Sequence, residues 1–224
     1  MLTTEARQKI LAENEAAAAE LRERFARAGT LVVDLISSPG SGKTALLEAT
    51  ARKLAGSLRI ACIVGDIATE RDADRLRAAG LPSRQITTGG ACHLEARNVR
   101  DALAAARFGP LDILFIENVG NLVCPASFAL GEDFKIVLLS VTEGHDKPFK
   151  YPGIFSRASV ALITKSDLLP YVAFDVERVR GEITTLRPNA RVLLTSVVDE
   201  KGLESWCDLL RSALGEKRGV VATA

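Results

Sequence analysis

Short apolar runs alternate with helix-forming stretches from residue 30 onward, and this alternation restricts the fold more than any other feature. The β-rich runs lie at 31–36, 59–64, 112–116, 135–141, 160–164 and 191–194, with a shorter candidate at 85–87. Helix-forming stretches lie between them, at 45–54, 70–79, 94–107, 176–186 and 203–214. Runs without polar alternation are typical of parallel strands covered by helices on both faces. The sequence therefore predicts a single doubly wound, mostly parallel α/β sheet.

The first 29 residues differ from the rest of the chain. Residues 4–27 contain no Gly or Pro and are rich in Ala, Glu and Arg, which predicts a helix that Gly29 ends. We expect a helix that lies on the domain surface or against a partner rather than in the core, because its larger apolar residues are few: Ile10, Leu11, Leu21 and Phe25. The predicted division is a helical extension over 1–29, an α/β domain over 30–215 and a frayed tail over 216–224.

Charge and cysteine content exclude several classes of protein. Lys and Arg total 29 and Asp and Glu total 28, so the net charge of +1 favours neither a nucleic-acid partner nor a membrane surface. Four cysteines in 224 residues do not make a disulfide scaffold. No apolar run approaches the roughly 20 residues of a membrane span, and the start lacks the apolar core of a signal peptide. We expect a cytoplasmic protein with reduced thiols.

A Gly-rich segment follows the first β-rich run and precedes a helix, which is the context of a phosphate-binding P-loop. Glycines allow backbone N–H groups to face phosphate oxygens, Lys43 would reach the β- and γ-phosphates, and the Thr44 hydroxyl would bind Mg²⁺. Ser37 stands where the motif usually begins with glycine. The predicted fold is thus of the P-loop NTPase type, and the residues expected to bind nucleotide here are Gly40, Ser41, Gly42, Lys43, Thr44 and Ala45.

Two carboxylates follow apolar runs and complete the predicted phosphate site. Asp66 and Glu117 each end a candidate strand, and the carboxyl ends of parallel strands are where ligands bind in such sheets. With Thr44 they would hold Mg²⁺, and with Lys43 they are the candidate catalytic residues. Residues 117–120 also resemble the acidic-x-x-Gly switch of GTPases, in which Gly120 would offer its N–H to the γ-phosphate.

A second loop indicates which base is bound. Thr164-Lys165-Ser166-Asp167 resembles the guanine motif Asn-Lys-x-Asp, with Thr in the first place. The Asp167 carboxylate can accept from the ring N–H and the exocyclic amine of guanine, a pair that adenine does not present. The Lys165 stem would cover the base, and replacement of Asn by Thr is expected to loosen the loop. A further guanine loop is predicted at Ser196 and Val197, so residues 30–215 read as a P-loop GTPase domain.

Three residues form a candidate metal site. Cys92 and His93 are adjacent near the start of a predicted helix, and Cys124 lies four residues beyond Gly120. Two thiolates and an imidazole suit Zn²⁺ or Ni²⁺, with a fourth ligand from water or another chain. A Cys-His pair alone is more often a half-buried thiol beside a capping histidine. The position of Cys124 after the switch predicts that nucleotide state alters the site. No metal role is expected for Cys62, Cys207 or His145.

Taken together, these motifs resemble the hydrogenase-maturation nickel-insertion GTPases, the HypB family. The resemblance rests on Ser37–Thr44, Gly65–Thr69, Gly89–Leu94, Glu117–Pro125 and Lys147–Pro152. It implies a Mg²⁺-dependent GTPase of low turnover that forms a homodimer with GTP bound. It also implies a Ni²⁺/Zn²⁺ site of Cys92, His93 and Cys124 at or near the dimer interface. The implied partners are a small zinc-containing nickel chaperone and the large-subunit precursor of [NiFe]-hydrogenase.

Three other readings remain open from the sequence. A urease-type nickel-insertion GTPase shares the fold, but its metal motif resembles Cys-Pro-His. A P-loop small-molecule kinase is disfavoured by Lys165 and Asp167. A metal-binding module with a vestigial nucleotide site would show no GTP hydrolysis that depends on Lys43.

Overall fold

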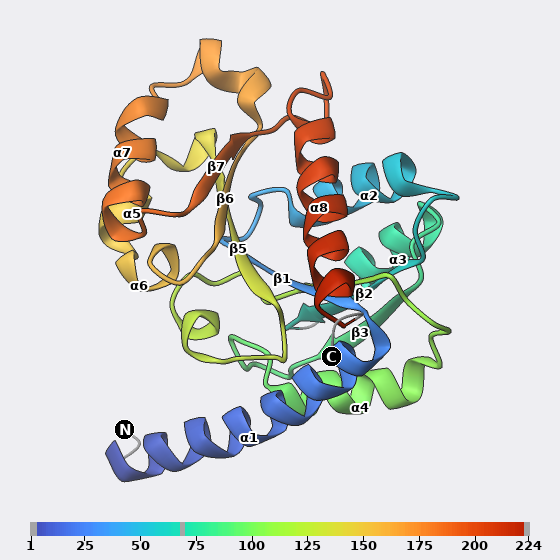
Figure 1. The fold of residues 1–224 in the computed structure, drawn as a ribbon. Helices are drawn as coiled ribbons and strands as arrows, with labels where there is room; N and C mark the ends of the chain where they lie inside the picture. The colour runs from blue at the N-terminus through green and yellow to red at the C-terminus, as the bar shows by residue number, and fades with distance from the viewer. Residues whose placement is uncertain (1–3, 68–69, 222–224) are drawn as a thin grey trace.

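The computed structural model describes residues 4–67 and 70–221 and shows a sheet covered by helices on both faces (Figure 1). Seven strands are hydrogen-bonded in the order β3-β2-β4-β1-β5-β6-β7, and every neighbouring pair is parallel. The predicted doubly wound sheet is confirmed. Ala68 and Thr69, which belong to one of the motifs quoted above, lie outside the described residues. The strands are β1 (Leu31–Ser37), β2 (Ile60–Asp66), β3 (Ser83–Thr87), β4 (Ile113–Glu117), β5 (Phe134–Ser140), β6 (Val160–Thr164) and β7 (Arg191–Leu194).

The helices divide between the two faces of the sheet. One apolar cluster joins the sheet to α2, α3 and α8, and two others join it to α1 with α4 and to α6 with α7. Within the described residues, no helix is both long enough and apolar enough to cross a membrane. The helices are α1 (Thr4–Ala28), α2 (Lys43–Leu54), α3 (Arg71–Ala78), α4 (Ala96–Ala106), α5 (Lys147–Lys150), α6 (Pro152–Phe155), α7 (Val176–Leu186) and α8 (Leu203–Val221), with 3-10 turns η1 (Cys124–Ser127), η2 (Val141–Glu143) and η3 (Ser166–Tyr171).

The central strand β1 contains one charged residue. Side chains alternate between the faces of a strand, so Asp34 shares a face with Val32 and Ile36. Those two neighbours belong to the α1–α4 cluster and the α6–α7 cluster, respectively. The Asp34 carboxylate is fully buried. A polar group therefore lies where the two apolar clusters on this face meet.

The C-terminal half of α1 belongs to the core, which corrects the expectation of a surface helix. Ala18, Leu21 and Phe25 are buried against α4. A Cβ on Gly131 would lie 2.6 Å from the Cβ of Leu21, so the loop after η1 packs directly on this helix. The N-terminal half of α1 projects beyond the sheet (Figure 1). A few apolar residues at helical spacing are thus enough to bury one end of the helix.

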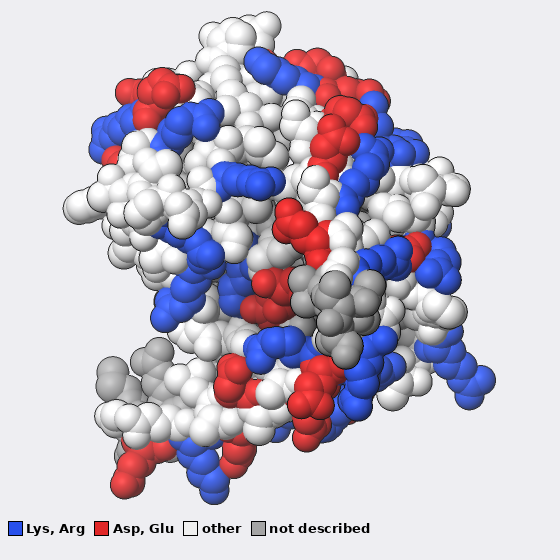
Figure 2. All heavy atoms as spheres, in the orientation of Figure 1, with Lys and Arg blue, Asp and Glu red and all other residues white. Residues whose placement is uncertain are grey.

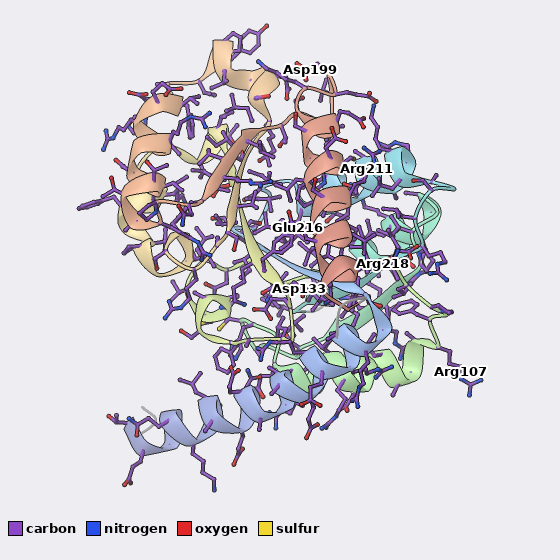
Figure 3. The ribbon with its side chains drawn as sticks, viewed as in Figure 1. Arg107, Asp133, Asp199, Arg211, Glu216 and Arg218 are labelled. Atoms are coloured by element: carbon purple, nitrogen blue, oxygen red, sulfur yellow. The ribbon has the colours of Figure 1, made fainter. Side chains whose placement is uncertain are left out.

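The C-terminal tail differs from the prediction that it frays after residue 215. Helix α8 continues to Val221, while residues 222–224 lie outside the described part of the chain. Near the end of α8, Lys217 pairs with Asp133 at 2.6 Å and Arg218 pairs with Asp112. Figure 3 labels Asp133 and Arg218. On the face shown in Figure 2, basic and acidic side chains are interspersed, in keeping with the small net charge.

Candidate functional site

A cavity of about 460 Å³ lies at the carboxyl ends of the central strands. The Gly-rich loop that borders it connects β1 to α2 and turns twice through the left-handed region, with φ of +76° at Gly40 and +95° at Gly42. Residues with a side chain rarely adopt this conformation, so the turn explains why glycine occupies both positions. The residues predicted to bind nucleotide or Mg²⁺ that line the cavity are Gly40, Gly42, Lys43, Thr44, Ala45, Asp66, Glu117 and Gly120.

Lys43 and Thr44 begin α2, and both side chains are already engaged. The Lys43 Nζ donates to Ser37 Oγ at 2.9 Å, so the serine that replaces the usual glycine fixes the lysine. Burial lowers the pKa of Lys43, and the facing Glu117 carboxylate opposes that shift. The Thr44 hydroxyl donates to Glu117 Oε1 at 2.8 Å. The predicted phosphate-binding and Mg²⁺-binding groups are therefore brought together.

Glu117 and Asp66 occupy the ends of the neighbouring strands β4 and β2. Glu117 is 3% exposed, and its Oε2 atom is buried without a hydrogen bond. Burial raises the pKa of Glu117 to about 7, against the opposing effects of Lys43 and the Thr44 hydroxyl. A buried carboxylate without enough hydrogen bonds is stabilised when a cation binds beside it, which fits the chemistry of a Mg²⁺ ligand.

Gly120 lies against the phosphate loop. A Cβ on Gly120 would meet the Pro39 Cγ at 2.9 Å and the Pro39 backbone nitrogen at 3.1 Å. Only glycine allows the segment after β4 to approach so closely. The predicted switch segment therefore packs directly on the loop that would hold the phosphates.

The predicted base-binding loops also contact the phosphate loop. Lys165 Nζ donates to the Gly40 carbonyl oxygen at 2.8 Å, and Asp167 accepts from the Ser196 hydroxyl at 2.6 Å. Thr164 Oγ1 donates to the Ser41 carbonyl oxygen at 2.7 Å. The Thr164 hydroxyl thus ties this loop to the phosphate loop, and a looser loop than the usual asparagine would give stays a prediction. A cavity of about 60 Å³ at this place is lined by Ala45, Thr164, Lys165 and Val197, among others.

The Ser41 side chain points away from the main cavity. Its hydroxyl donates to Glu143 Oε1 at 2.6 Å, and Glu143 also accepts from the backbone N–H of Ser140 at 3.0 Å. The loop after β5 therefore contacts the phosphate loop on the side away from the main cavity. Glu143 is not among the residues predicted from the sequence, where its only signal is its place in a loop near the Lys147–Pro152 run.

The candidate metal ligands converge. One ligand atom from each of Cys92, His93 and Cys124 lies within 4.8 Å of the others, and all three residues are partly buried. Cys92 Sγ lies 3.7 Å from His93 Nδ1, close to the roughly 3.5 Å edge of a tetrahedral site with sulfur and nitrogen ligands. Burial lowers the pKa of His93, which favours the neutral, metal-binding imidazole. The residues present therefore fit a soft divalent ion.

The position of the pair in the chain differs slightly from the prediction. Helix α4 begins at Ala96 rather than at residue 94, so Cys92 and His93 lie in the turn before it. Glu95 is the N-cap, and its carboxylate lies 3.9 Å from His93 Nε2. The His93 ring packs on Phe128 with a centroid distance of 3.9 Å. The site thus joins the turn before α4 to the segment after β4.

A buried polar network beside both sites was missed by the sequence analysis. Asn118 is 1% exposed and contacts Asp34 of β1, which pairs with Lys135 of β5. The signal was available: Asp34 and Lys135 are charged residues within otherwise apolar β-rich runs. Their pairing required the strand order, because 101 residues separate them.

Comparison with known proteins identifies the family. A family model described as the CobW/HypB/UreG nucleotide-binding domain matches residues 31–194. Over 203 residues the chain is 47% identical to the hydrogenase maturation factor HypB of Escherichia coli K12, covering 91% of this chain and 70% of that protein. The chain belongs to the HypB family. HypB membership places it among P-loop NTPases and excludes the small-molecule kinase reading.

Other HypB proteins extend the similarity to the structure. The hydrogenase/urease maturation factor HypB of Helicobacter pylori J99 is 45% identical over 207 residues, covering 91% of this chain and 85% of that protein. A crystal structure of H. pylori HypB in complex with nickel superposes with a TM-score of 0.87 at 43% identity. It covers 91% of this chain and 96% of that one. The fold of the whole described domain is therefore the HypB fold.

Proposed function

We propose that this chain is a Mg²⁺-dependent GTPase of low turnover whose nucleotide state controls the binding and release of nickel during hydrogenase maturation. The observation that carries the proposal is the position of the Cys92–His93–Cys124 cluster. Cys124 follows Gly120, and Gly120 packs on Pro39 of the phosphate loop. The γ-phosphate site and the metal ligand Cys124 are therefore connected by the short segment that begins at Gly120.

Guanine nucleotide would bind across the two loops that meet at Gly40. The backbone of Gly40, Ser41, Gly42 and Ala45 would face the phosphates, and Lys43 would leave Ser37 to reach the β- and γ-oxygens. Asp167 would accept from guanine, Lys165 would cover the base, and the segment at Ser196 and Val197 would read the base oxygen. The contact between Lys165 and Gly40 supports this arrangement, because it holds the base loop beside the phosphate loop.

Hydrolysis would use the groups at the ends of β1, β2 and β4. Thr44, Asp66 and Glu117 are the proposed holders of Mg²⁺, which when bound neutralises charge on the phosphates. Lys43 would stabilise the same charge, and Gly120 would donate its N–H to the γ-phosphate. The raised pKa of Glu117 means that the carboxyl loses its proton when a cation binds beside it.

Nickel is the proposed cargo of the second site, and zinc is its competitor. Cys92, His93 and Cys124 supply two sulfur ligands and one nitrogen ligand. Three protein ligands leave a position open, which suits an ion that must be handed on. The proposed fourth ligand comes from water or from a second copy of the chain in a GTP-bound homodimer.

The proposed partners follow from the family. The E. coli relative is named a hydrogenase maturation factor, and the H. pylori structure contains nickel. We infer that this chain acts in the cytoplasm with a small zinc-containing nickel chaperone and delivers nickel to a hydrogenase large-subunit precursor.

The test combines hydrolysis with metal binding. GTP should be hydrolysed in preference to ATP, and Lys43→Ala should abolish turnover while leaving nickel binding in the GDP state. Cys92→Ala should lose nickel binding and keep GTP turnover. Preference for ATP, or hydrolysis that survives in Lys43→Ala, would overturn the proposal.

A further inference from the structure

One buried carboxamide touches both the nucleotide switch and the metal-binding turn. Asn118 directly follows Glu117, and its Oδ1 accepts from the backbone N–H of Val119 at 3.0 Å. The same oxygen accepts from the backbone N–H of Leu94 at 3.3 Å. Since Leu94 follows His93, a single side-chain oxygen joins the segment of Glu117 to the segment of His93.

The orientation of this carboxamide is fixed from its other end. Asn118 Nδ2 donates to Asp34 Oδ1 at 3.0 Å, and Lys135 Nζ donates to Asp34 Oδ2 at 2.8 Å. A flipped amide would place Nδ2 against two backbone donors and Oδ1 against a carboxylate, so the partners determine the assignment. Asp34 and Lys135 are neighbours in register on β1 and β5. The carboxamide is thereby anchored to the centre of the sheet.

Lys135 reaches the opposite side of the metal site. Its Nζ donates to the Phe128 carbonyl oxygen at 2.8 Å and pairs with Glu132 at 2.9 Å. The Phe128 ring lies on the His93 ring. His93 is thus held from two sides, through the Leu94 backbone and through Phe128, and both connections lead to Asp34.

The cost of this arrangement argues for a role beyond packing. A buried ion pair loses hydration that its mutual attraction repays only in part, and apolar residues of similar size would commonly fill such a place at least as well. Asp34 and Lys135 interrupt apolar strands. Beyond their own pairing, Asp34 accepts from Asn118, and Lys135 donates to the Phe128 carbonyl oxygen and pairs with Glu132. The polar groups contact the two segments that flank the proposed metal ligands.

We propose that Asn118, held by Asp34 and Lys135, is a positioning residue that couples the position of the 117–120 switch to the geometry of the Cys92–His93–Cys124 site. The inference rests on the proposed function and names the residues that connect its two sites. The contact between Asn118 and Leu94 is the longest in the network. Movement of the backbone at residue 118 toward a γ-phosphate lengthens it first and releases the turn that carries His93.

Asn14 provides a matched control. This asparagine of α1 is 6% exposed, accepts from the backbone N–H of Ala96 at 2.8 Å and donates to the Ala129 carbonyl oxygen at 2.8 Å. It bridges the segments at Ala96 and Ala129 beside the metal site, and neither of these two hydrogen bonds reaches residues 117–120. Asn118→Leu and Asn14→Leu each remove the same carboxamide from a buried position.

The experiment measures nickel(II) affinity of the full chain with GDP and with a non-hydrolysable GTP analogue, from the absorption of the nickel–thiolate bond. In the wild type the two dissociation constants should differ by at least about fivefold, the lower range of coupling between sites. Asn118→Leu should bring their ratio close to one. Asn14→Leu should weaken binding by up to about tenfold in both states and leave the ratio unchanged.

The outcomes separate the inference from the proposed function. A ratio that persists in folded Asn118→Leu, or that disappears equally in Asn14→Leu, overturns the role of Asn118 alone. A ratio of one in the wild type overturns nucleotide control itself, and the inference with it. If Asn118→Leu fails to fold, Asn118→Ser serves in its place, and a wild-type ratio in that variant overturns the inference.

Discussion

Leu94 lies against Gly65 with no space for a side chain between them. A Cβ on Gly65 would meet the Cγ and both Cδ atoms of Leu94 at 2.8–2.9 Å. Gly65 precedes Asp66 at the end of β2, and Leu94 follows His93. The strand end that serves the phosphate site is therefore in direct contact with the turn that serves the metal site.

Gly65→Ala should destabilise the protein and weaken nickel binding. The added methyl group forces Leu94 out of a fully buried position, and such overpacking costs about 1–3 kcal/mol. Urea unfolding measures the loss, and the double variant Gly65→Ala with Leu94→Ala should recover part of it. Gly109→Ala is the control, because a Cβ there meets nothing within 4 Å. Equal unfolding free energies for Gly65→Ala and the wild type would contradict the packing described.

The buried Glu117 carboxyl should make the nucleotide-free protein less stable as pH rises. Its pKa is about 7 in the folded state against an ordinary value of 4.5, so between these values the folded protein binds more protons than the unfolded one. The unfolding free energy therefore falls with increasing pH across this window, by a total on the order of 3 kcal/mol.

Urea unfolding without Mg²⁺ at several pH values from 4.5 to 7.5 tests this dependence. Lys43, Thr44, Asp72 and Arg75 also act on the Glu117 pKa, so the variant used must leave them in place. Glu117→Gln keeps the shape of the side chain and should flatten the slope. A slope that is the same in Glu117→Gln would assign the pH dependence to another group.

Asp167→Asn should change the preferred base from guanine to xanthine. The carboxylate accepts two donors from guanine, whereas the asparagine amide presents a donor that matches the additional carbonyl oxygen of xanthine. The charge-assisted hydrogen bonds that are lost are worth about 1.5–3 kcal/mol each, so GTP affinity should fall by roughly a hundredfold or more. Competition binding of GTP, XTP and ATP measures the change. Ser196→Ala removes the hydroxyl that donates to Asp167 and accepts from the backbone N–H groups of Val198 and Asp199, and it should keep the preference for GTP because the Asp167 carboxylate remains.

Much of the fold could be predicted because its signals are local. The β-rich runs at 160–164 and 191–194 and the helix at 176–186 match β6, β7 and α7 in both bounds. The phosphate-binding segment was recognisable because a strand, a glycine turn and a helix follow one another within a few residues. Cys92, His93 and Cys124 were assigned to one site from the chemistry of their side chains, and the structure brings them together.

The features that were missed depend on contacts between distant parts of the chain. Burial of Leu21 and Phe25 depends on α4 and the loop at Gly131, and the order of the tail depends on Asp112 and Asp133. The hydroxyl bond from Thr164 to the phosphate loop spans 123 residues. Residue composition and motif spacing do not indicate which distant residues pair. The only sign of the Asn118 network in the sequence was the presence of isolated charged residues within apolar runs.

The central claim is that nucleotide state and metal binding are coupled through one cluster of ligands. Nickel stoichiometry and dimer fraction, measured on the same samples with GDP and with a GTP analogue, test it most directly. The account predicts that both quantities differ between the two nucleotides, and that Cys92→Ala loses nickel while it still binds GTP. Equal nickel affinity and equal dimerisation in the two states would contradict it.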